Sequence, residues 1–573
     1  MPPARESRQY RILVMAPADN SNSGINRAFI GISRRAESVD RKTLVRTFVD
    51  IGPLFTVLSS RDHQIVYGRR GTGKTHALVY LVEQESAKKS AAVYIDLRNI
   101  GSSGVLYGDT DVPLSQRATS LTLDLVGAIH EELLNAALTL DFDLSSVGPA
   151  LDELAAASTE IEVQGQTTVE SSTTNTRTDE DSFQAQLNVQ QAPGMSLGAS
   201  SKQNVTAGDA TRVSKAGTSR YRLHFGRVGS ALGRVVSTLA NGTLLVILDE
   251  WSTVPLELQP YLADLVRRAL FPVPGLTVKI AAIEQRTNFK LGEGTDYTGI
   301  EVGADASADV DLDDYMVFDN NEDRAIAFFK ELLFSHYKSE EGGTTEGSIK
   351  PKFATADQLV QAAFTQHNAF EDFVKSAEGV PRDAFNVLSI AAQRGINEKI
   401  SIPTIRIAAR TWYQRDKEAA IRANDEAQAL LNWIIDEVIA HRKARAFLLR
   451  TNTRHPLIDA LFDARLLHVV KKSISGQEEV GVRYDAYKLD YGCYVDLLAT
   501  KAAPSVFLFQ SETVSYDAES AEAENAAAVL VPNDDYRAIR RAILDLNTFE
   551  NRFKGLEPRT PTAQLVKDNL MWI

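Results

Sequence analysis

Apolar and polar positions in the first half of the chain follow two alternating patterns. Short, almost wholly apolar runs predict strands at residues 65–67, 91–97, 244–248 and 276–283. Apolar residues spaced three or four positions apart predict helices at residues 75–86, 121–140, 228–239 and 258–270. Apolar strands separated by helices are typical of a parallel sheet, because the connecting helices cover its faces. The pattern therefore predicts an α/β fold built on a parallel sheet.

The second half of the chain has mainly helical periodicity. Helices dominate from about Arg324 to Arg410, after an acidic stretch at residues 292–323. The next block predicts three helices and then two strands, at residues 425–440, 442–450, 456–466, 467–474 and 482–489. Three helices and a β-hairpin describe a winged helix. An Ala/Glu-rich linker and an amphipathic helix are then predicted, at residues 518–528 and near residues 536–546.

Two segments differ from this regular pattern. Residues 1–40 are polar and Arg-rich, apart from a short run from Tyr10 to Met15, and predict a loosely packed arm. Between residues 160 and 219, Ser, Thr, Gln, Asn, Gly and Ala dominate. The low hydrophobicity of this insertion fits a disordered loop. Apolar and polar residues alternate at 161–163 and 183–190, which fits a long polar β-hairpin arm that meets a partner. Both interpretations stay open.

Composition and charge exclude several classes of protein. The 573 residues are of ordinary globular composition and predict three or four domains. With 62 basic and 75 acidic residues the net charge is −13, so nucleic acid would have to bind a local patch. The single cysteine, Cys493, excludes a disulfide framework and a cysteine-built metal site. No apolar run is long enough to span a membrane, so a cytoplasmic protein without a membrane partner is expected. The nine histidines show no metal-ligand spacing, and no G-x-S-x-G motif occurs.

A phosphate-binding loop is the most specific motif in the chain. The residues Gly68, Arg69, Arg70, Gly71, Thr72, Gly73, Lys74 and Thr75 match G-x-x-x-x-G-K-[ST], between a predicted strand and a predicted helix. The glycines let backbone N–H groups surround a phosphate at the start of the helix. We expect Lys74 to reach the β- and γ-phosphates of ATP and Thr75 to ligate Mg²⁺. His76, the next residue, is included in the predicted nucleotide site.

A pair of carboxylates supplies the second half of the predicted site. Asp249 and Glu250 directly follow the apolar run at 244–248. Asp249 can hold the Mg²⁺ shell, and Glu250 can orient or polarise the attacking water. Because a glutamate accompanies the aspartate, the pair favours a hydrolysing ATPase over a static nucleotide binder.

These motifs resemble the AAA+ superfamily of P-loop ATPases. The resemblance implies a polar sensor of the γ-phosphate after the strand at 276–283, with Gln285, Arg286 and Thr287 as candidates. The sequence GVPRDAFNVL at 379–388 resembles the sensor-2 motif of a helical lid, in which Arg382 would contact the phosphates. The family also completes its site with an arginine from a neighbouring subunit. Arg267 or Arg268 lies where that arginine is expected, although either fits a solvated cation at a helix end.

The lid motif and the winged-helix block resemble, more narrowly, the origin-recognition and initiator branch of AAA+. Bacterial relatives of this branch often lie in mobile or defence loci, so the resemblance suggests antiviral defence as a setting. It covers about residues 41–500, and the insertion and the C-terminal tail depart from it. The domains expected are an arm at 1–40, a AAA+ core at 41–320 containing the insertion 160–219, a helical lid at 321–424, a winged-helix domain at 425–500 and an extension at 501–573.

The winged-helix block carries a local excess of basic residues. Between His441 and Lys472 there are eight basic and two acidic residues. The candidates for phosphate contacts on duplex DNA are Arg442, Lys443, Arg445, Arg450, Arg454, Lys471 and Lys472. Over residues 425–500 the charges nearly cancel, with ten basic and eleven acidic residues. Protein docking and a structural cap therefore remain alternatives to DNA contact.

The sequence supports three functional hypotheses. The first is an ATP-hydrolysing AAA+ module that forms homo-oligomers and couples its assembly and its DNA binding to nucleotide state. The second is a nucleotide-gated switch or scaffold that binds a protein partner through its winged helix and the insertion 160–219. The third is a DNA-binding scaffold with a vestigial nucleotide site, and the intact residues Lys74, Thr75, Asp249 and Glu250 argue against it.

Overall fold

A five-stranded parallel sheet forms the centre of the structure, which is a computed structural model. The residues described are 21–50, 52–101, 112–140, 142–158, 161–171, 211–221, 224–292, 294, 296–316, 318–319, 321–339, 351–451, 453, 455–475, 481–500, 503–504 and 543–554. The sheet has the order β2-β5-β6-β1-β9, and every neighbouring pair is parallel. Its strands are β1 (Gln64–Tyr67), β2 (Ala91–Asp96), β5 (Leu244–Asp249), β6 (Leu276–Ala282) and β9 (Ser307–Asp311). The predicted α/β fold with a parallel sheet is confirmed.

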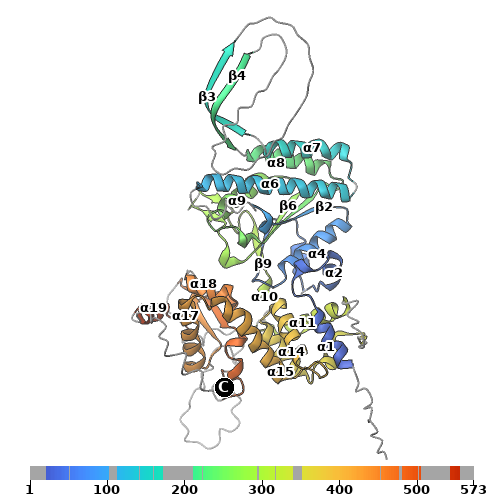
Figure 1. Ribbon diagram of the computed structural model, residues 1–573, viewed down its shortest axis with the longest axis vertical. Coiled ribbons are helices and arrows are strands. Elements are labelled where there is room, and N and C mark those ends of the chain that lie inside the picture. Colours follow the sequence, from blue (N-terminus) through green and yellow to red (C-terminus); the bar gives the residue numbers. More distant parts are fainter. Residues whose placement is uncertain are drawn as a thin grey trace, which may run out of the picture.

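Helices cover both faces of this sheet (Figure 1). They are α4 (Lys74–Ala87), α6 (Leu114–Thr139), α7 (Leu144–Ser158), α8 (Phe225–Thr238) and α9 (Gln259–Leu265), the last continued by a π-helical turn at Val266–Leu270. Side chains alternate along β5 between two hydrophobic cores. Leu244, Val246 and Leu248 pack with α6, α7, α8 and α9. Leu245 and Ile247 face the core on the α4 side. Burial on both faces explains why these strands are apolar throughout.

The edge strand β9 was not expected, because it lies in the acidic stretch at 292–323. Only Val310 of its five residues is fully buried, so its sequence lacks the apolar run of the central strands. Pairing with β1 defines it, for example between Val66 and Val310. The short helix α10 (Leu312–Met316) follows, and β7 (Lys290–Leu291) pairs with β8 (Thr298–Gly299) nearby.

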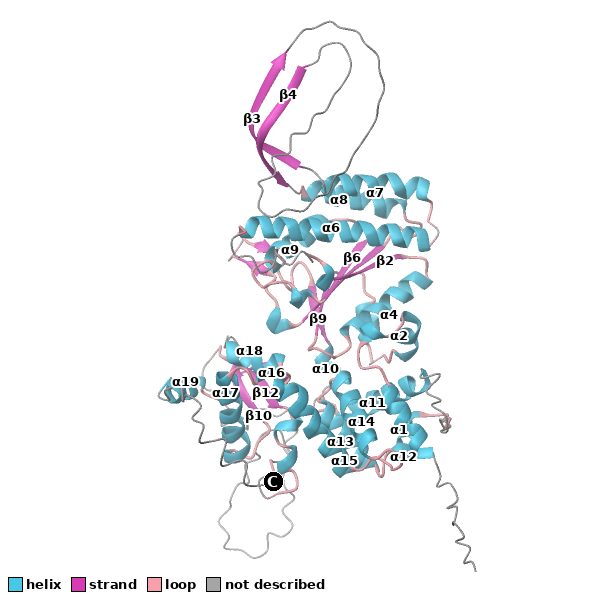
Figure 2. Ribbon diagram, in the orientation of Figure 1, coloured by secondary structure: helices cyan, strands magenta, loops and turns pink. Residues whose placement is uncertain are grey.

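The polar insertion includes a two-stranded antiparallel ribbon. Strands β3 (Ile161–Ser171) and β4 (Thr211–Tyr221) pair along their whole length, and Figure 2 shows this ribbon beyond α7 and α8. For these residues a hairpin arm is therefore the correct interpretation. The alternating segment at 183–190 lies outside the described residues.

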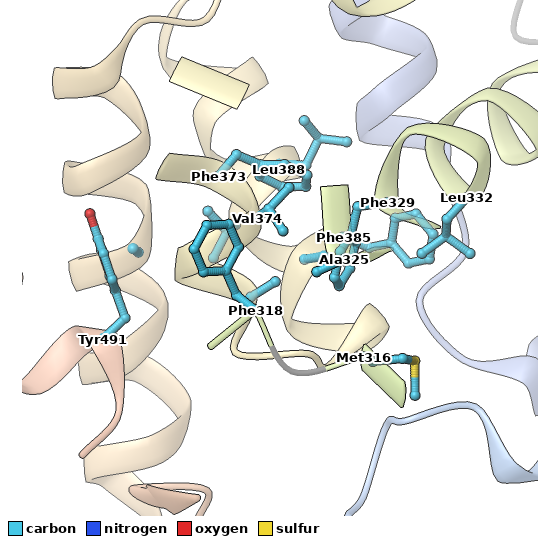
Figure 3. Packing of buried hydrophobic residues seen from close by; sticks show 14 of the residues in the cluster. Met316, Phe318, Ala325, Phe329, Leu332, Phe373, Val374, Phe385, Leu388 and Tyr491 are labelled. Carbon is cyan, nitrogen blue, oxygen red and sulfur yellow. The ribbon is translucent and has the colours of Figure 1, made fainter. Parts of the chain in front are cut away.

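The region after the sheet is helical, as predicted. It contains α11 (Glu322–Ser339), α12 (Ala356–Ala363), α13 (His367–Ala377), α14 (Pro381–Arg394), α15 (Ile402–Trp412) and α16 (Glu418–Ile421), with a π-helical turn at Tyr413–Lys417. Figure 3 shows part of its core, which contains Phe329, Phe373 and Phe385, and the same cluster includes Tyr491 of the C-terminal region. The same core continues to the α4 face of the sheet and into the C-terminal region. These three parts therefore share one apolar interior.

The prediction of a loosely packed arm at 1–40 is wrong for the described residues of this segment. Helix α1 (Ser21–Gly31) buries Ile25 and Phe29 against the helical region. The side-chain amide of Asn26 donates hydrogen bonds to the carbonyls of Gly395, at 2.8 Å, and Glu398, at 2.9 Å. The amide thus satisfies carbonyls beyond the C-terminal end of α14, which explains why a polar residue is buried here. Helices α2 (Arg41–Thr47) and α3 (Leu54–Leu58) follow, whereas the run from Tyr10 to Met15 lies outside the described residues.

The C-terminal region corrects one predicted helix. It contains α17 (Asp425–Ile435), a π-helical turn at Asp436–His441, α18 (Pro456–Asp463) and three antiparallel strands in the order β10-β12-β11. The predicted helix at 442–450 is wrong, because residues 446–450 form the strand β10 (Ala446–Arg450). Lys443 has a φ of +52°, which ends the preceding helical segment, and the consecutive residues Phe447, Leu448 and Leu449 are all buried. The predicted strands are β11 (Leu467–Ser475) and β12 (Arg483–Leu489). The region is thus winged-helix-like, with one helix fewer than predicted.

The last described element is α19 (Leu546–Lys554). The predicted linker at 518–528 lies outside the described residues. The predicted helix near 536–546 also lies outside them as far as residue 542. Within the described part of the chain, no helix has both the length and the apolar character needed to cross a bilayer.

Candidate nucleotide-binding site

The phosphate-binding loop connects β1 to α4 at the carboxyl edge of the sheet. Gly73 has a φ of +95° and immediately precedes α4, a conformation that glycine adopts without strain. Gly71 lies so close to the lid that a Cβ atom there would come within 2.7 Å of the Cβ of Arg382. Glycine at these two positions therefore lets the loop turn tightly beneath the lid helix α14.

The acidic pair lies opposite this loop, at the end of β5. The hydroxyls of Thr75 and Tyr94 both donate to Oδ2 of Asp249, at 2.7 and 2.6 Å. Asp249 is fully buried. Glu250 has a left-handed backbone, with φ of +58°, and its N–H donates to Oδ1 of Asp249 at 2.7 Å. Burial, and then the charge of Asp249, raise the pKa of Glu250 above its ordinary value.

Lys74 makes contacts within the loop itself. Its Nζ donates to the backbone carbonyls of Gly68, at 2.7 Å, and Arg69, at 3.0 Å. Burial lowers its pKa, although Asp249 opposes this shift. The amine is thus held beside the loop by neutral acceptors that phosphate oxygens can replace.

A cavity of about 410 Å³ joins these groups. The residues that line it include Arg70, Gly71, Gly73, Lys74, Thr75, His76, Glu250 and Arg382. The backbone N–H of Arg382 donates to the carbonyl of Gly71 at 3.3 Å. Burial lowers the pKa of its guanidinium, and its Nε is buried without a hydrogen-bond partner among the described residues. A half-buried guanidinium with one unpartnered nitrogen at the wall of a cavity suits an anionic ligand.

The other end of the cavity has apolar walls and two histidines. Residues from the N-terminal segment and α14 form these walls, namely Ile32, Val39, Leu44 and Phe385. Nε2 of His76 donates to the carbonyl of Leu44 at 2.6 Å, and Nδ1 of His336 donates to the carbonyl of Leu332 at 2.9 Å. Burial lowers the pKa of both imidazoles, that of His336 to about 4. Each neutral ring therefore has one nitrogen left as an acceptor.

The sequence did not indicate two residues that lie beside the acidic pair. Tyr94 lies in β2 and Arg98 just after it, and only the pairing of β2 with β5 places them there. Arg98 lines the cavity and forms ion pairs with Asp96, at 2.5 Å, and Glu37, at 3.2 Å. No local motif marks these residues, because the sheet order brings them to the site.

The three candidates for sensor 1 do not line this cavity in the described structure. Gln285 lines a smaller pocket that includes Tyr67 and Lys472. Nε of Arg286 pairs with Asp463 of α18 at 2.5 Å. The hydroxyl of Thr287 donates to the carbonyl of Glu284 at 2.7 Å. A different residue, Ile283, lies at the cavity wall.

The two candidate arginine fingers lie outside the cavity of their own chain. Arg267 and Arg268 pair with Asp264 at 2.9 and 3.2 Å. Arg267 also lies over the ring of Tyr297, and Arg268 over that of Phe225. Arg268 is the more exposed of the two, at 58% against 26% for Arg267.

The basic residues proposed to contact DNA do not form one uniform surface. Lys443, Arg450, Lys471 and Lys472 are exposed. Arg445 pairs with Asp319 at 3.4 Å, and Lys472 pairs with Asp311 at 2.9 Å and with Glu284. Arg442 lies near Glu437, at 3.9 Å, and donates to the carbonyl of Ile543 at 3.3 Å. Arg454 lies outside the described residues. Two of the seven candidates, Arg445 and Lys472, are therefore tied to acidic side chains before the C-terminal region.

The donor set can hold the expected ligands. Among the described residues no group of three or more His, Cys, Asp or Glu side chains is arranged to hold a metal ion. Asp249 and Thr75 instead present two neighbouring oxygens. This set fits Mg²⁺, which proteins commonly bind through one or two carboxylates together with substrate phosphates and water.

The sheet order, the loop after β1 and the acidic pair after β5 define a P-loop domain of the AAA+ class. Residues 33–305 match a family model described as ORC-CDC6-like. This part of the chain is therefore an ORC-CDC6-like AAA+ domain, as the sequence resemblance suggested. No curated protein sequence matches the chain.

Two solved structures align over most of the chain. The structure of Drosophila ORC bound to DNA aligns with 11% sequence identity and a TM-score of 0.27. The alignment covers 86% of the present chain and 95% of the Drosophila chain. The structure of the Aeropyrum pernix ORC1 protein in complex with DNA aligns with 12% sequence identity and a TM-score of 0.25. The alignment covers 81% of the present chain and 93% of the Aeropyrum pernix chain.

Proposed function

We propose that the chain binds and hydrolyses ATP and that its nucleotide state controls its assembly and its binding to duplex DNA. The observation that carries the proposal is the cavity that brings Lys74, Thr75 and Glu250 together with Arg382. Steady-state ATP turnover and particle size, measured on the full chain with and without duplex DNA, test this function. A chain that neither binds nor hydrolyses ATP would contradict it.

The roles of the residues follow from their positions. Phosphate oxygens would replace the carbonyls of Gly68 and Arg69 as acceptors for Lys74. Thr75 and Asp249 would hold Mg²⁺, which supplies positive charge to the phosphates. Glu250 would orient the attacking water and accept its proton. Arg382 would contribute a lid cation at the phosphate end of the cavity.

Homo-oligomer formation is the part of the proposal that concerns Arg267 and Arg268. In their own chain both arginines pair with Asp264 outside the cavity. A copy packed against this face would bring one of them to the γ-phosphate of its neighbour, where it would stabilise the charge of the transition state.

The two cavity histidines lead us to expect ATP rather than GTP. The acceptor nitrogens of His76 and His336 match the 6-amino group of adenine and oppose the 6-oxo group of guanine. ATP should bind at least about tenfold more tightly than GTP, because the wrong base would leave buried acceptors unpaired. In His336→Phe the ratio of the two dissociation constants should fall towards one. Equal affinity of the unaltered chain for both nucleotides would contradict this assignment.

DNA binding should depend on Lys443 more than on Lys472. Lys443→Ala should weaken duplex binding and lower the salt slope of the affinity by about one, because Lys443 is exposed and one phosphate would no longer be neutralised. Lys472→Ala is the matched control, because that amine is held by Asp311 and Glu284. Titrations at several salt concentrations measure both effects. If Lys472→Ala weakened binding as much as Lys443→Ala, the expectation would be contradicted.

A nucleotide-gated scaffold that binds a protein through the winged-helix region and the insertion 160–219 is a second candidate. The ribbon β3–β4, which extends beyond α7 and α8, favours it (Figure 1). Tightly retained, nearly unhydrolysed nucleotide would distinguish such a scaffold from a chain that turns ATP over. The suggested setting in antiviral defence has no support in the fold or in the comparisons.

A further inference from the structure

Arg69 differs from its neighbours in the phosphate-binding loop because its side chain points away from the nucleotide cavity. Only 2% of this side chain is exposed. Its Nε and its backbone N–H donate to the carboxylate of Asp313, at 2.8 and 2.9 Å. One terminal nitrogen donates to the carbonyl of Glu378 at 3.0 Å, and the other contacts Nδ1 of His468. The guanidinium thus joins the loop to α10, to the segment before α14 and to β11.

His468 continues this contact into the C-terminal region. It is 1% exposed, and its Nε2 lies 2.9 Å from Oδ2 of Asp490. A guanidinium can only donate, so Nδ1 of His468 must accept, and Nε2 carries the proton that bonds to Asp490. Asp490 pairs in turn with Lys417, which lies 3.0 Å from Asp383 of the lid helix. A continuous buried chain of polar groups therefore runs from the loop through the C-terminal region to the residue after Arg382.

The backbone of Arg69 is also central to the shape of the loop. Its carbonyl accepts hydrogen bonds from the hydroxyl of Thr72, at 2.9 Å, and from Nζ of Lys74, at 3.0 Å. The N–H of Thr72 also donates to this carbonyl, at 3.4 Å. The backbone carbonyl of Arg69 therefore bonds to other residues of the loop, while its guanidinium is held by residues outside the loop.

We propose that Arg69 is a positioning residue, and that its contact with His468 lets the C-terminal region hold the loop in its nucleotide-binding shape. The proposal rests on the nucleotide binding proposed for this loop. A loop that is already ordered loses less conformational entropy when it binds a phosphate. By thermodynamic reciprocity, nucleotide in the loop must stabilise the seating of the C-terminal region to the same extent. The winged-helix-like region would thus respond to nucleotide through a direct contact.

Two substitutions of His468 separate its two hydrogen bonds. In His468→Asn, the amide oxygen can replace Nδ1 as the acceptor for Arg69, while the bond to Asp490 is removed. In His468→Gln, the amide nitrogen can replace Nε2 as the donor to Asp490, while the acceptor for Arg69 is removed. If His468 had only a structural role, the two variants would be expected to affect the loop equally.

Amide hydrogen exchange of the nucleotide-free chain measures the loop directly, in a peptide spanning residues 67–77. Exchange should be about tenfold faster in His468→Gln and near the original rate in His468→Asn, since couplings of this kind usually span about 5- to 150-fold. Arg69→Lys should resemble His468→Gln, because one ammonium group cannot reach three separate partners. The dissociation constant of a fluorescent ATP analogue should rise about tenfold in the same variants.

Leu461→Ala is the control for general loss of stability, because it opens a cavity at a fully buried residue of α18 that takes no part in the hydrogen bonds of the Arg69 side chain. It should leave exchange in the loop unchanged. Equal exchange in the Asn and Gln variants, or unchanged exchange in both His468→Gln and Arg69→Lys, would overturn the proposal. If the unaltered chain failed to bind the ATP analogue, the proposed function would fall, while the exchange measurement would still decide whether the C-terminal region holds the loop.

Discussion

Glu250→Gln should lower the rate of ATP hydrolysis by at least about 100-fold, because a positioned general base typically contributes factors of about 10²–10⁴. The amide keeps the size of the carboxylate but cannot accept the proton of the attacking water. Nucleotide binding should change little, because Lys74, Thr75 and Asp249 retain their contacts. Particles that assemble with ATP should therefore persist longer in this variant.

The pH dependence gives the same prediction a second measurement. Burial and Asp249 raise the pKa of Glu250, so the base should lose activity by protonation at a higher pH than an ordinary glutamate would. The rate of the unaltered chain should fall on the acidic side as pH decreases through that raised pKa. The residual rate of Glu250→Gln should lack this decline. Glu257→Gln is a matched control, because Glu257 follows the same strand but lies outside the cavity and pairs with Arg117. Full turnover in Glu250→Gln would assign the base to another residue.

The residues that line the candidate nucleotide site could be predicted from the sequence because their strongest signals are local. The loop from Gly68 to Thr75 is contiguous, and the acidic pair directly follows an apolar strand. The spacing of apolar residues predicted the central strands, since burial on both faces leaves few polar positions. The strand β9 shows the limit of this reasoning. Its polar residues lie at the sheet edge, and only pairing with β1 reveals it.

Long-range charge pairing was beyond sequence reasoning. Lys472 fitted a patch of DNA contacts by composition, yet it pairs with Glu284 and Asp311, which are more than 150 residues away in the chain. Arg69 fitted the loop motif, although its side chain bonds to Asp313 and contacts His468. A count of charged residues along the chain cannot show which charged side chains form ion pairs with distant parts of the chain.

The buried lysine Lys417 is expected to have the largest effect on stability. It is 2% exposed and lies between Asp383, at 3.0 Å, and Asp490. Lys417→Met should lower the free energy of unfolding by about 3–5 kcal/mol, because buried Asp490 loses its lysine counter-charge and buried Asp383 keeps only Arg465, at 3.1 Å. Adding Asp490→Asn should recover part of this stability, since it removes one of those charges. Urea unfolding measures both changes.

The pH dependence of this destabilisation follows from the direction of the lysine pKa. Burial opposes the charge of Lys417, but Asp383 and Asp490 outweigh it and raise the pKa. Because the folded pKa exceeds the unfolded one, the stabilisation is complete below about pH 10 and disappears only as pH rises through the raised value. The difference between the unaltered chain and Lys417→Met should therefore be constant from about pH 6 to 9. Lys330→Met is the control, because its partner Asp357 is 69% exposed, and it should cost less than about 1 kcal/mol. Equal destabilisation in the two methionine variants would mean that Lys417 is not the buried counter-charge between the lid and the C-terminal region.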